Sequence, residues 1–312
     1  MRVYRWDLDK TYLVTDFNSV RGIVRSAMEP AHRKRATPGA TALLRELGRE
    51  SPGWRSRICI VSGSPTQMRG VLEEKLRMDG VRWDTLTLKD NLANLKRGRL
   101  RAVRDQFGYK LPHLLAGRIG LGEAVRETLF GDDAEIDALV YSVYADAIAG
   151  RIGAAELSRI MVAAGSYPDH VVDALAALRR VGTADAVDRI FIRLDRGRPP
   201  AEFHRFGSRV VPIRGWFQAA LVLFGAGEVD ADGVARVFAT ADITAREAAG
   251  QAEDILARGH VSIDAVRRVC EHVSAAPFVP DMPALLTTDW PYHPPVAPVG
   301  VDYLAVLSEF RR

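Results

Sequence analysis

The sequence predicts an α/β fold in which helices cover a mainly parallel sheet, and three observations support this prediction. Short apolar runs alternate with stretches of helical periodicity, as in successive βαβ units. Residues 58–61 are apolar throughout, as expected of a strand buried on both faces of a parallel sheet. Polar residues end three of the runs, at Asp7, Ser62 and Asp132, where ligands of such sheets bind. Together these features describe a Rossmann-like three-layer sandwich.

The expected strands are short and rich in β-branched or aromatic residues. They lie near residues 3–8, 58–62, 84–88, 127–131 and 188–193. Residues 209–213 are expected to add an edge strand, because proline is tolerated at a sheet edge.

Capping residues and apolar stripes predict the helices. Ser64 is expected to cap a helix that begins at Pro65, with Gln67 as its capping-box partner. The positive end of that helix would then open beside Ser62 and favour an anion. Ser262 is expected to cap another helix. Further helices are expected near residues 40–49, 136–148, 155–164, 168–178 and 216–225.

The length of 312 residues suggests a core with an appendage. We expect a core domain over residues 1–228, with a helical insert near residues 151–185. Residues 229–312 are expected to form a C-terminal helical module and a proline-rich tail. Proline excludes regular helix and central strand from that tail, and Trp290 and Tyr292 suggest that it packs against the body.

Composition places few limits on function. The chain is 47% hydrophobic and 26% charged, which suits a globular protein with a substantial core. Its two cysteines imply no disulfide framework, so a reducing cytoplasmic location is expected. No signal peptide is visible, and the apolar stretch 216–224 is too short to cross a bilayer. Any membrane contact would be peripheral.

The net charge of +4 identifies no partner, but basic residues gather in residues 21–35 and 96–104. Such runs are typical of solvated faces. The alternative is a basic rim that attracts a polyanionic substrate, either a lipid headgroup or a nucleic acid.

The segment from Asp7 to Thr11 carries the clearest chemical signal. Asp7 and Asp9 are two residues apart at the end of a predicted strand, so their carboxylates point the same way. One carboxylate of such a pair can attack as a nucleophile while the other transfers protons. Further along come Ser62, Lys110 and an acidic turn that contains Asp132, Asp133 and Asp137.

This ordered set resembles the haloacid dehalogenase (HAD) superfamily of phosphotransferases. The family's motifs match Asp7, Asp9 and Thr11, then Ser62, then Lys110, and finally Asp132 and Asp137, with Asp133 also available. Residues 61–65, Gly131 with Asp132, Tyr141 and residues 189–193 look like the actin-patch-type phosphatidate phosphatase branch. The resemblance covers about the first two-thirds of the chain. The helical insert and Asp133, where the branch has a small residue, depart from it.

The resemblance implies a magnesium-dependent phosphomonoester hydrolase that acts through an aspartyl-phosphate. Asp7 would be the nucleophile, Asp9 the general acid and base, and Lys110 the neutralising cation. Mg²⁺ would be held by Asp7, the Asp9 carbonyl and Asp132, with Asp137 or Asp133 fixing its waters. Ser62 and the amides after it would cradle the phosphoryl group. The predicted substrate-binding set is Thr11, Gly63 and Ser64, although Thr11 is expected to brace the loop rather than to touch substrate.

Several alternatives stay open at this point. Lys89 ends a predicted strand and competes with Lys110, although a solvated lysine is the simpler interpretation. Arg193, at another strand end, would touch substrate or form a surface salt bridge. The segment between Thr11 and Arg57 has no room for a cap domain, which favours a bulky, phosphatidate-like substrate unless the helical insert covers the entrance. The other candidates are a phosphatase for nucleic-acid ends or phosphoproteins, and a non-catalytic binding module that recruits a partner.

Overall fold

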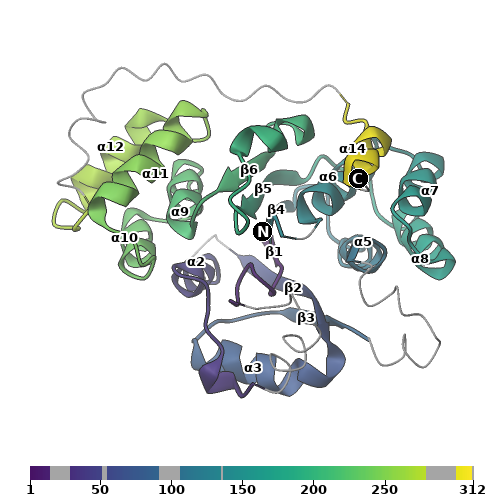
Figure 1. Ribbon diagram of the computed structural model, residues 1–312, viewed down its shortest axis with the longest axis horizontal. Helices are drawn as coiled ribbons and strands as arrows, with labels where there is room; N and C mark the ends of the chain where they lie inside the picture. Colours follow the sequence, from purple (N-terminus) through teal and green to yellow (C-terminus); the bar gives the residue numbers. More distant parts are fainter. Residues whose placement is uncertain (15–28, 51–54, 91–105, 135, 279–299, 311–312) are drawn as a thin grey trace.

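The chain folds around a six-stranded sheet in which every neighbouring pair of strands is parallel (Figure 1). This computed structural model describes residues 1–14, 29–50, 55–90, 106–134, 136–278 and 300–310. The strand order is β3-β2-β1-β4-β5-β6. The strands are β1 (Arg2–Trp6), β2 (Ser56–Pro65), β3 (Thr85–Lys89), β4 (Arg126–Asp132), β5 (Val187–Arg193) and β6 (Val210–Ile213). The predicted fold class is therefore confirmed, and the edge strand is present.

Helices cover both faces of the sheet. Successive side chains of a strand point to opposite faces, and each face packs against its own helices in a separate hydrophobic cluster. Tyr4 and Trp6 of β1 belong to one cluster, and Leu129 of β4 belongs to the other. The helices of the first cluster are α2 (Ala40–Leu47), α3 (Arg69–Met78), α9 (Trp216–Gly225), α10 (Ala231–Ala239), α11 (Ala245–Ala257) and α12 (Ile263–His272). Those of the second are α5 (Gln106–Ala116), α6 (Asp137–Ile148), α7 (Ala154–Ala163), α8 (Pro168–Leu178) and α14 (Tyr303–Phe310). Short 3-10 turns are η1 (Ala31–Arg33), η2 (Thr66–Met68) and η4 (Pro200–Phe206).

The α6 helix is buried along its whole length. It packs against β4 and β5 on one side and against α5 on another. A helix enclosed in this way has no need for a polar stripe, which explains its apolar composition. The two helices predicted for the insert are also present, and α8 packs against α5.

The predicted cap at Ser64 is wrong. The β2 strand continues to Pro65, a 3-10 turn follows, and α3 begins only at Arg69. The Ser64 hydroxyl instead donates a hydrogen bond to Asp9 Oδ2 at 2.8 Å. The cap predicted at Ser262 is confirmed, since its hydroxyl accepts from the Ala265 amide at 3.3 Å.

The C-terminal helices share their core with the sheet. The Trp6 ring lies 4.9 Å from the ring of Trp216 in α9, and α10 and α12 pack on α9. The α14 helix lies across the molecule from α12 (Figure 1). There the Tyr303 hydroxyl donates to Asp146 of α6. The predicted proline-rich tail, with Trp290 and Tyr292, lies mostly outside the described residues. Among the helices that the structure describes, none combines the length and apolarity required to span a membrane.

Candidate active site

The sheet order places a topological switch point beside β1. The chain runs outward from β1 to β2 and β3 on one side, and to β4, β5 and β6 on the other. Ligands of open α/β sheets bind at such a point, beyond the carboxyl ends of the strands. Asp7 directly follows β1, Asp132 ends β4 and Ser62 lies near the end of β2. The Asp7 amide donates to the Phe130 carbonyl at 3.0 Å, which keeps Asp7 at this edge.

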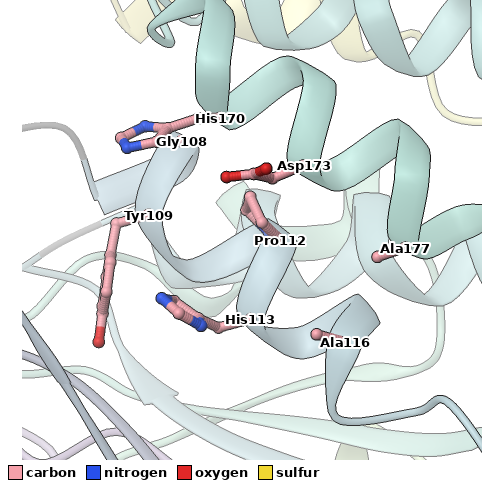
Figure 2. Close-up of a pocket in the computed structure, with 8 residues that line it drawn as sticks. All are labelled: Gly108, Tyr109, Pro112, His113, Ala116, His170, Asp173 and Ala177. Atoms are coloured by element: carbon pink, nitrogen blue, oxygen red, sulfur yellow. The ribbon is translucent and has the colours of Figure 1, made fainter.

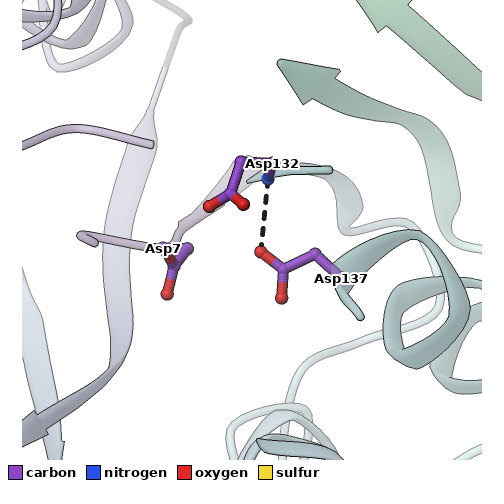
Figure 3. Close-up of side chains that lie close together, drawn as sticks. All are labelled: Asp7, Asp132 and Asp137. Carbon is purple, nitrogen blue, oxygen red and sulfur yellow. Dashed lines mark hydrogen bonds between the residues drawn. The ribbon is translucent and has the colours of Figure 1, made fainter. Parts of the chain in front are cut away.

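Three carboxylates meet at the switch point. Asp7, Asp132 and Asp137 each offer a carboxylate oxygen, and these oxygens lie within 4.8 Å of one another (Figure 3). All three residues are buried. Asp137 is the first residue of α6, where the helix dipole favours a carboxylate, and its Oδ2 accepts from the Asp132 amide at 3.4 Å.

Gly131 makes the approach of Asp137 possible. A Cβ atom at Gly131 would lie 2.4 Å from Asp137 Oδ2 and 2.6 Å from Asp137 Cβ. Any larger residue would therefore push the start of α6 away from the end of β4. The absence of a side chain at this position is part of how the acidic cluster is built.

Lys110 supplies a cation to the cluster. Its Nζ lies 3.0 Å from Asp7 Oδ1 and donates to Asp137 Oδ1 at 2.6 Å. The side chain is fully buried and comes from inside α5. Lys89 is also buried, at 1% exposure, so its interpretation as a solvated lysine is wrong. Its Nζ lies 5.4 Å from the centre of the Tyr109 ring.

The Asp9 carboxylate is held by two hydroxyl groups. Asp9 Oδ2 accepts from Ser62 Oγ at 2.9 Å and from Ser64 Oγ at 2.8 Å. The Ser64 amide in turn donates to Ser62 Oγ at 3.0 Å. A Cβ atom at Gly63 would lie 2.4 Å from Gln106 Nε2, so Gly63 lets the Gln106 amide approach β2 closely.

The loop after β1 is braced from three directions. Lys10 has a left-handed backbone with φ 61°, and its carbonyl accepts from Arg193 Nε at 3.0 Å and Nη2 at 2.6 Å. Thr11 Oγ1 donates to Asp132 Oδ2 at 3.0 Å, and the Thr11 carbonyl accepts from Thr37 Oγ1 at 2.6 Å. Thr11 therefore braces the loop as expected. Arg193 also forms the anticipated salt bridge, with Asp195.

Asp133 turns away from the cluster. Its Oδ1 accepts from the Arg196 amide at 2.8 Å and its Oδ2 lies 3.4 Å from the Arg198 amide. Its own amide donates to the Arg193 carbonyl at 3.0 Å. These contacts place Asp133 with the loop after β5, whereas the carboxylates close enough together to hold a metal ion are those of Asp7, Asp132 and Asp137. We therefore leave Asp133 out of the candidate ligands.

Burial and the nearby carboxylates shift the pKa values of two neighbouring residues, Tyr141 and Lys34. Burial raises the pKa of Tyr141 well above its ordinary value, and the negative charge of Asp137 raises it further. The Tyr141 hydroxyl donates to the Phe130 carbonyl at 3.4 Å, directly beneath the end of β4. Burial lowers the pKa of Lys34, while the negative charges of Glu29 and Asp9 oppose that shift.

The basic run at residues 21–35 is described only in part. His32, Arg33 and Arg35 are exposed, whereas Lys34 is buried at 5% exposure and interacts electrostatically with Asp9. The rest of that run, including Arg21 and Arg25, and the whole run at 96–104 lie outside the described residues.

The donor set fits a hard divalent cation. The three carboxylates and the Lys110 ammonium together carry more negative than positive charge. Burying like charges is costly unless a cation or protons compensate them. Carboxylate oxygens are the ligands that Mg²⁺ prefers in proteins.

Comparison with known proteins finds no family model, no curated protein and no solved structure that matches the chain. The resemblance to haloacid dehalogenase phosphatases therefore stays a prediction from the motifs. The chemistry of the centre must be inferred from its own residues.

Two contributors carried no site signal in the sequence. Gln106 and Tyr109 reach the centre only through the packing of α5. The role of Arg193 in holding Lys10 joins residues 183 positions apart, which no local pattern reports. For Gln106, the only local indication in the sequence was the glycine at position 63, which leaves space for its amide.

Proposed function

We propose that the chain is a magnesium-dependent phosphomonoester hydrolase of the HAD type, with Asp7 as the nucleophile. One observation carries the proposal: a buried carboxylate at a strand end is 3.0 Å from a lysine ammonium and close to two further carboxylates. A second carboxylate, Asp9, lies two residues away and is oriented separately by two hydroxyls. A nucleophile and a distinct proton-transfer group are the pair that such hydrolysis requires.

Asp7 and Lys110 prepare the attack. Lys110 favours the ionised form of Asp7 and offers positive charge to the transferring phosphoryl group. Asp7, Asp132 and Asp137 would hold Mg²⁺, which would reduce the repulsion between an anionic nucleophile and an anionic phosphoryl group. An oxygen of Asp7 forms a bond to phosphorus while the bond from phosphorus to the leaving oxygen breaks.

Asp9 moves the protons. In its carboxylic acid form it gives its proton to the leaving oxygen. The resulting carboxylate then takes a proton from water, whose oxygen attacks phosphorus and breaks the bond to Asp7. Because Oδ2 accepts both the Ser62 and Ser64 hydroxyls, we place the transferred proton on Oδ1.

This separation of roles weighs against a non-catalytic binding module. A protein that only binds phosphate has no use for an acid held apart from the nucleophile. For the substrate we retain a bulky phosphorylated molecule of the phosphatidate type, with nucleic-acid ends and phosphoproteins as the alternatives. A screen of phosphate release from lipid, nucleotide, sugar and peptide phosphates separates these.

The proposal is tested by hydrolysis of 4-nitrophenyl phosphate with Mg²⁺ and with a chelator. We expect Asp7→Asn to lower turnover by about 10³-fold or more, because the covalent step is lost. Asp9→Asn should slow turnover and leave phosphate on the Asp7 peptide, detectable by mass spectrometry. The matched control is Asp173→Asn, an exposed aspartate on α8, which should keep the wild-type rate. Full activity in Asp7→Asn would refute the proposal.

A further inference from the structure

Lys89 and Tyr109 flank the candidate active site without a role in the proposed reaction. Lys89 ends β3 and pairs in register with Pro65, the residue after Ser64. Tyr109 directly precedes Lys110 on α5. Lys89 therefore lies at the same edge of the sheet as Asp7 and Ser62, with the Tyr109 ring beside it.

The Tyr109 hydroxyl is a buried donor in need of an acceptor. Tyr109 is only 6% exposed, and its hydroxyl has no hydrogen-bond partner in the part of the chain that the structure describes. Buried polar groups are nearly always hydrogen-bonded, so each exception calls for an explanation. The neighbouring Lys89 ammonium, 5.4 Å from the ring centre, is itself a donor.

The Tyr109 side chain is oriented so that its hydroxyl does not face α8. Tyr109 also lines a groove of about 240 Å³ between α5 and α8, together with His113, His170 and Asp173. Figure 2 shows the Tyr109 hydroxyl pointing away from His170 and Asp173. The His113 ring packs edge-on at 4.8 Å. The hydroxyl is thus directed away from α8.

The local charges favour an anionic ligand. Burial raises the pKa of Tyr109, so the phenol stays protonated and can only gain from an acceptor. The positive charge of Lys110 opposes this rise in the pKa of Tyr109, and the negative charge of Asp7 adds to it. Both the phenol and the ammonium are hydrogen-bond donors, and hydrogen bonds from an ammonium to an oxyanion are charge-assisted and therefore stronger than neutral ones.

We propose that Lys89 and Tyr109 form a subsite for a second oxyanion of the substrate, a phosphate or carboxylate separate from the phosphoryl group that reacts at Asp7. The inference rests on the proposed function and narrows the substrate class to phosphomonoesters with a second anionic group. The Gln106 amide lies close to Gly63, which stands in the sequence between the two serines whose hydroxyls hold Asp9.

The test compares substrates that differ only in the second group. Propane-1,3-diol bisphosphate and 3-phosphonooxypropanoate carry a second phosphate or a carboxylate, and propyl phosphate carries neither. We expect kcat/KM for a doubly anionic substrate to exceed that for propyl phosphate by about tenfold, as for a charge-assisted contact. Tyr109→Phe and Lys89→Met should each reduce this ratio severalfold. Tyr167→Phe, a tyrosine outside the centre, should leave the ratio unchanged.

The outcomes separate the two proposals. A preference for the bisphosphate alone assigns the subsite to phosphate, and a preference for both assigns it to any oxyanion. A ratio near one, or a ratio that neither variant changes, overturns the subsite. If no substrate is hydrolysed, the proposed function fails, and calorimetric binding of propane-1,3-diol bisphosphate and propyl phosphate with Mg²⁺ tests the subsite instead. Equal affinities in that measurement would overturn it.

Discussion

The β4 strand has buried charged groups near both of its ends, and the two ends differ in how those groups are paired. Near the start of β4, Glu127 accepts hydrogen bonds from Arg5 Nε at 2.5 Å, Arg118 Nη1 at 3.0 Å and the Tyr144 hydroxyl at 2.8 Å. Both carboxylate oxygens of Glu127 have donors, and two guanidinium groups surround one carboxylate. We call these residues the Glu127 network.

The carboxyl end of β4 is rich in carboxylates. Asp7, Asp132 and Asp137 meet Lys110, so these four groups are negative in sum. This contrast helps to distinguish buried charges that stabilise the fold from buried charges that bind a ligand. A carboxylate whose two oxygens both accept hydrogen bonds from its own chain stabilises the fold. A cluster in which carboxylates outnumber cations, here called the unbalanced end, is prepared for a ligand. The predictions below test that distinction.

Breaking the Glu127 network should have the largest effect on stability. Glu127→Gln leaves Arg5 and Arg118 buried without their carboxylate, which costs about 3–5 kcal/mol in comparable pairs. Urea unfolding measures this loss. The matched variant Asp7→Asn removes a buried carboxylate from the unbalanced cluster, and it should leave the free energy of unfolding unchanged or raise it. An equal loss in both variants would remove the distinction between the two ends.

Magnesium should stabilise the protein through the unbalanced end alone. At about 100 times Kd, a ligand that binds only the folded state adds about 2.7 kcal/mol to the free energy of unfolding. We expect this gain in the wild type, in Asp133→Asn and in Asp173→Asn, and we expect Asp132→Asn to abolish it. Thermal unfolding with and without Mg²⁺ gives the comparison. Loss of the effect in Asp133→Asn would return that carboxylate to the ligand set.

Local pattern was enough to predict the sheet and the edge at which Asp7, Ser62 and Asp132 lie. Strand runs are short and apolar, and parallel strands place their carboxyl ends together. Ser64 was misplaced because a serine followed by proline and, three positions on, glutamine also fits a capping box. In the structure the Ser64 hydroxyl donates to Asp9 instead, and these two residues are 55 positions apart in the sequence.

Local sequence pattern also fails to distinguish the neighbouring carboxylates of Asp132 and Asp133. Asp132 and Asp133 are adjacent in the sequence, yet one contacts Thr11 and the other contacts the amides of Arg196 and Arg198. Which of them faces the centre depends on the loop after β5, and no spacing rule contains that information. The Glu127 network likewise has no local signature, because its members come from β1, β4, α6 and the chain after α5.

Gly131→Ala should disturb the unbalanced end by a smaller amount. The new Cβ would meet the Asp137 side chain at 2.4–2.8 Å, and such overpacking costs about 1–3 kcal/mol. Displacement of Asp137 should also weaken the Mg²⁺ effect on thermal unfolding. Gly122→Ala, where no atom lies within 4 Å of the added group, is the matched control and should change neither quantity. If both alanine variants had the same stability and the same Mg²⁺ effect, the close approach of Asp137 to Gly131 would not be required for the acidic cluster.

The smallest effect should be the pH dependence that the Glu127 network contributes to stability. Burial raises the pKa of Glu127, but the charge of Arg5 and the hydrogen bonds of Arg5 and Tyr144 outweigh it, so the pKa lies below its ordinary value. A depressed pKa means that the stabilisation is fully present above the unfolded value, about 4.3, and is lost as the pH falls through the folded value.

The free energy of unfolding of the wild type should therefore decline below about pH 4.3, with a contribution from Glu127 that Glu127→Gln lacks. Asp188 and Asp254, whose pKa values are also lowered by their arginine partners against the effect of burial, contribute equally to both proteins and cancel in the difference. The difference between the two urea midpoints should thus shrink as the pH falls from 6 to 3. A constant difference across that range would mean that the charge of Glu127 adds nothing to the network beyond its shape.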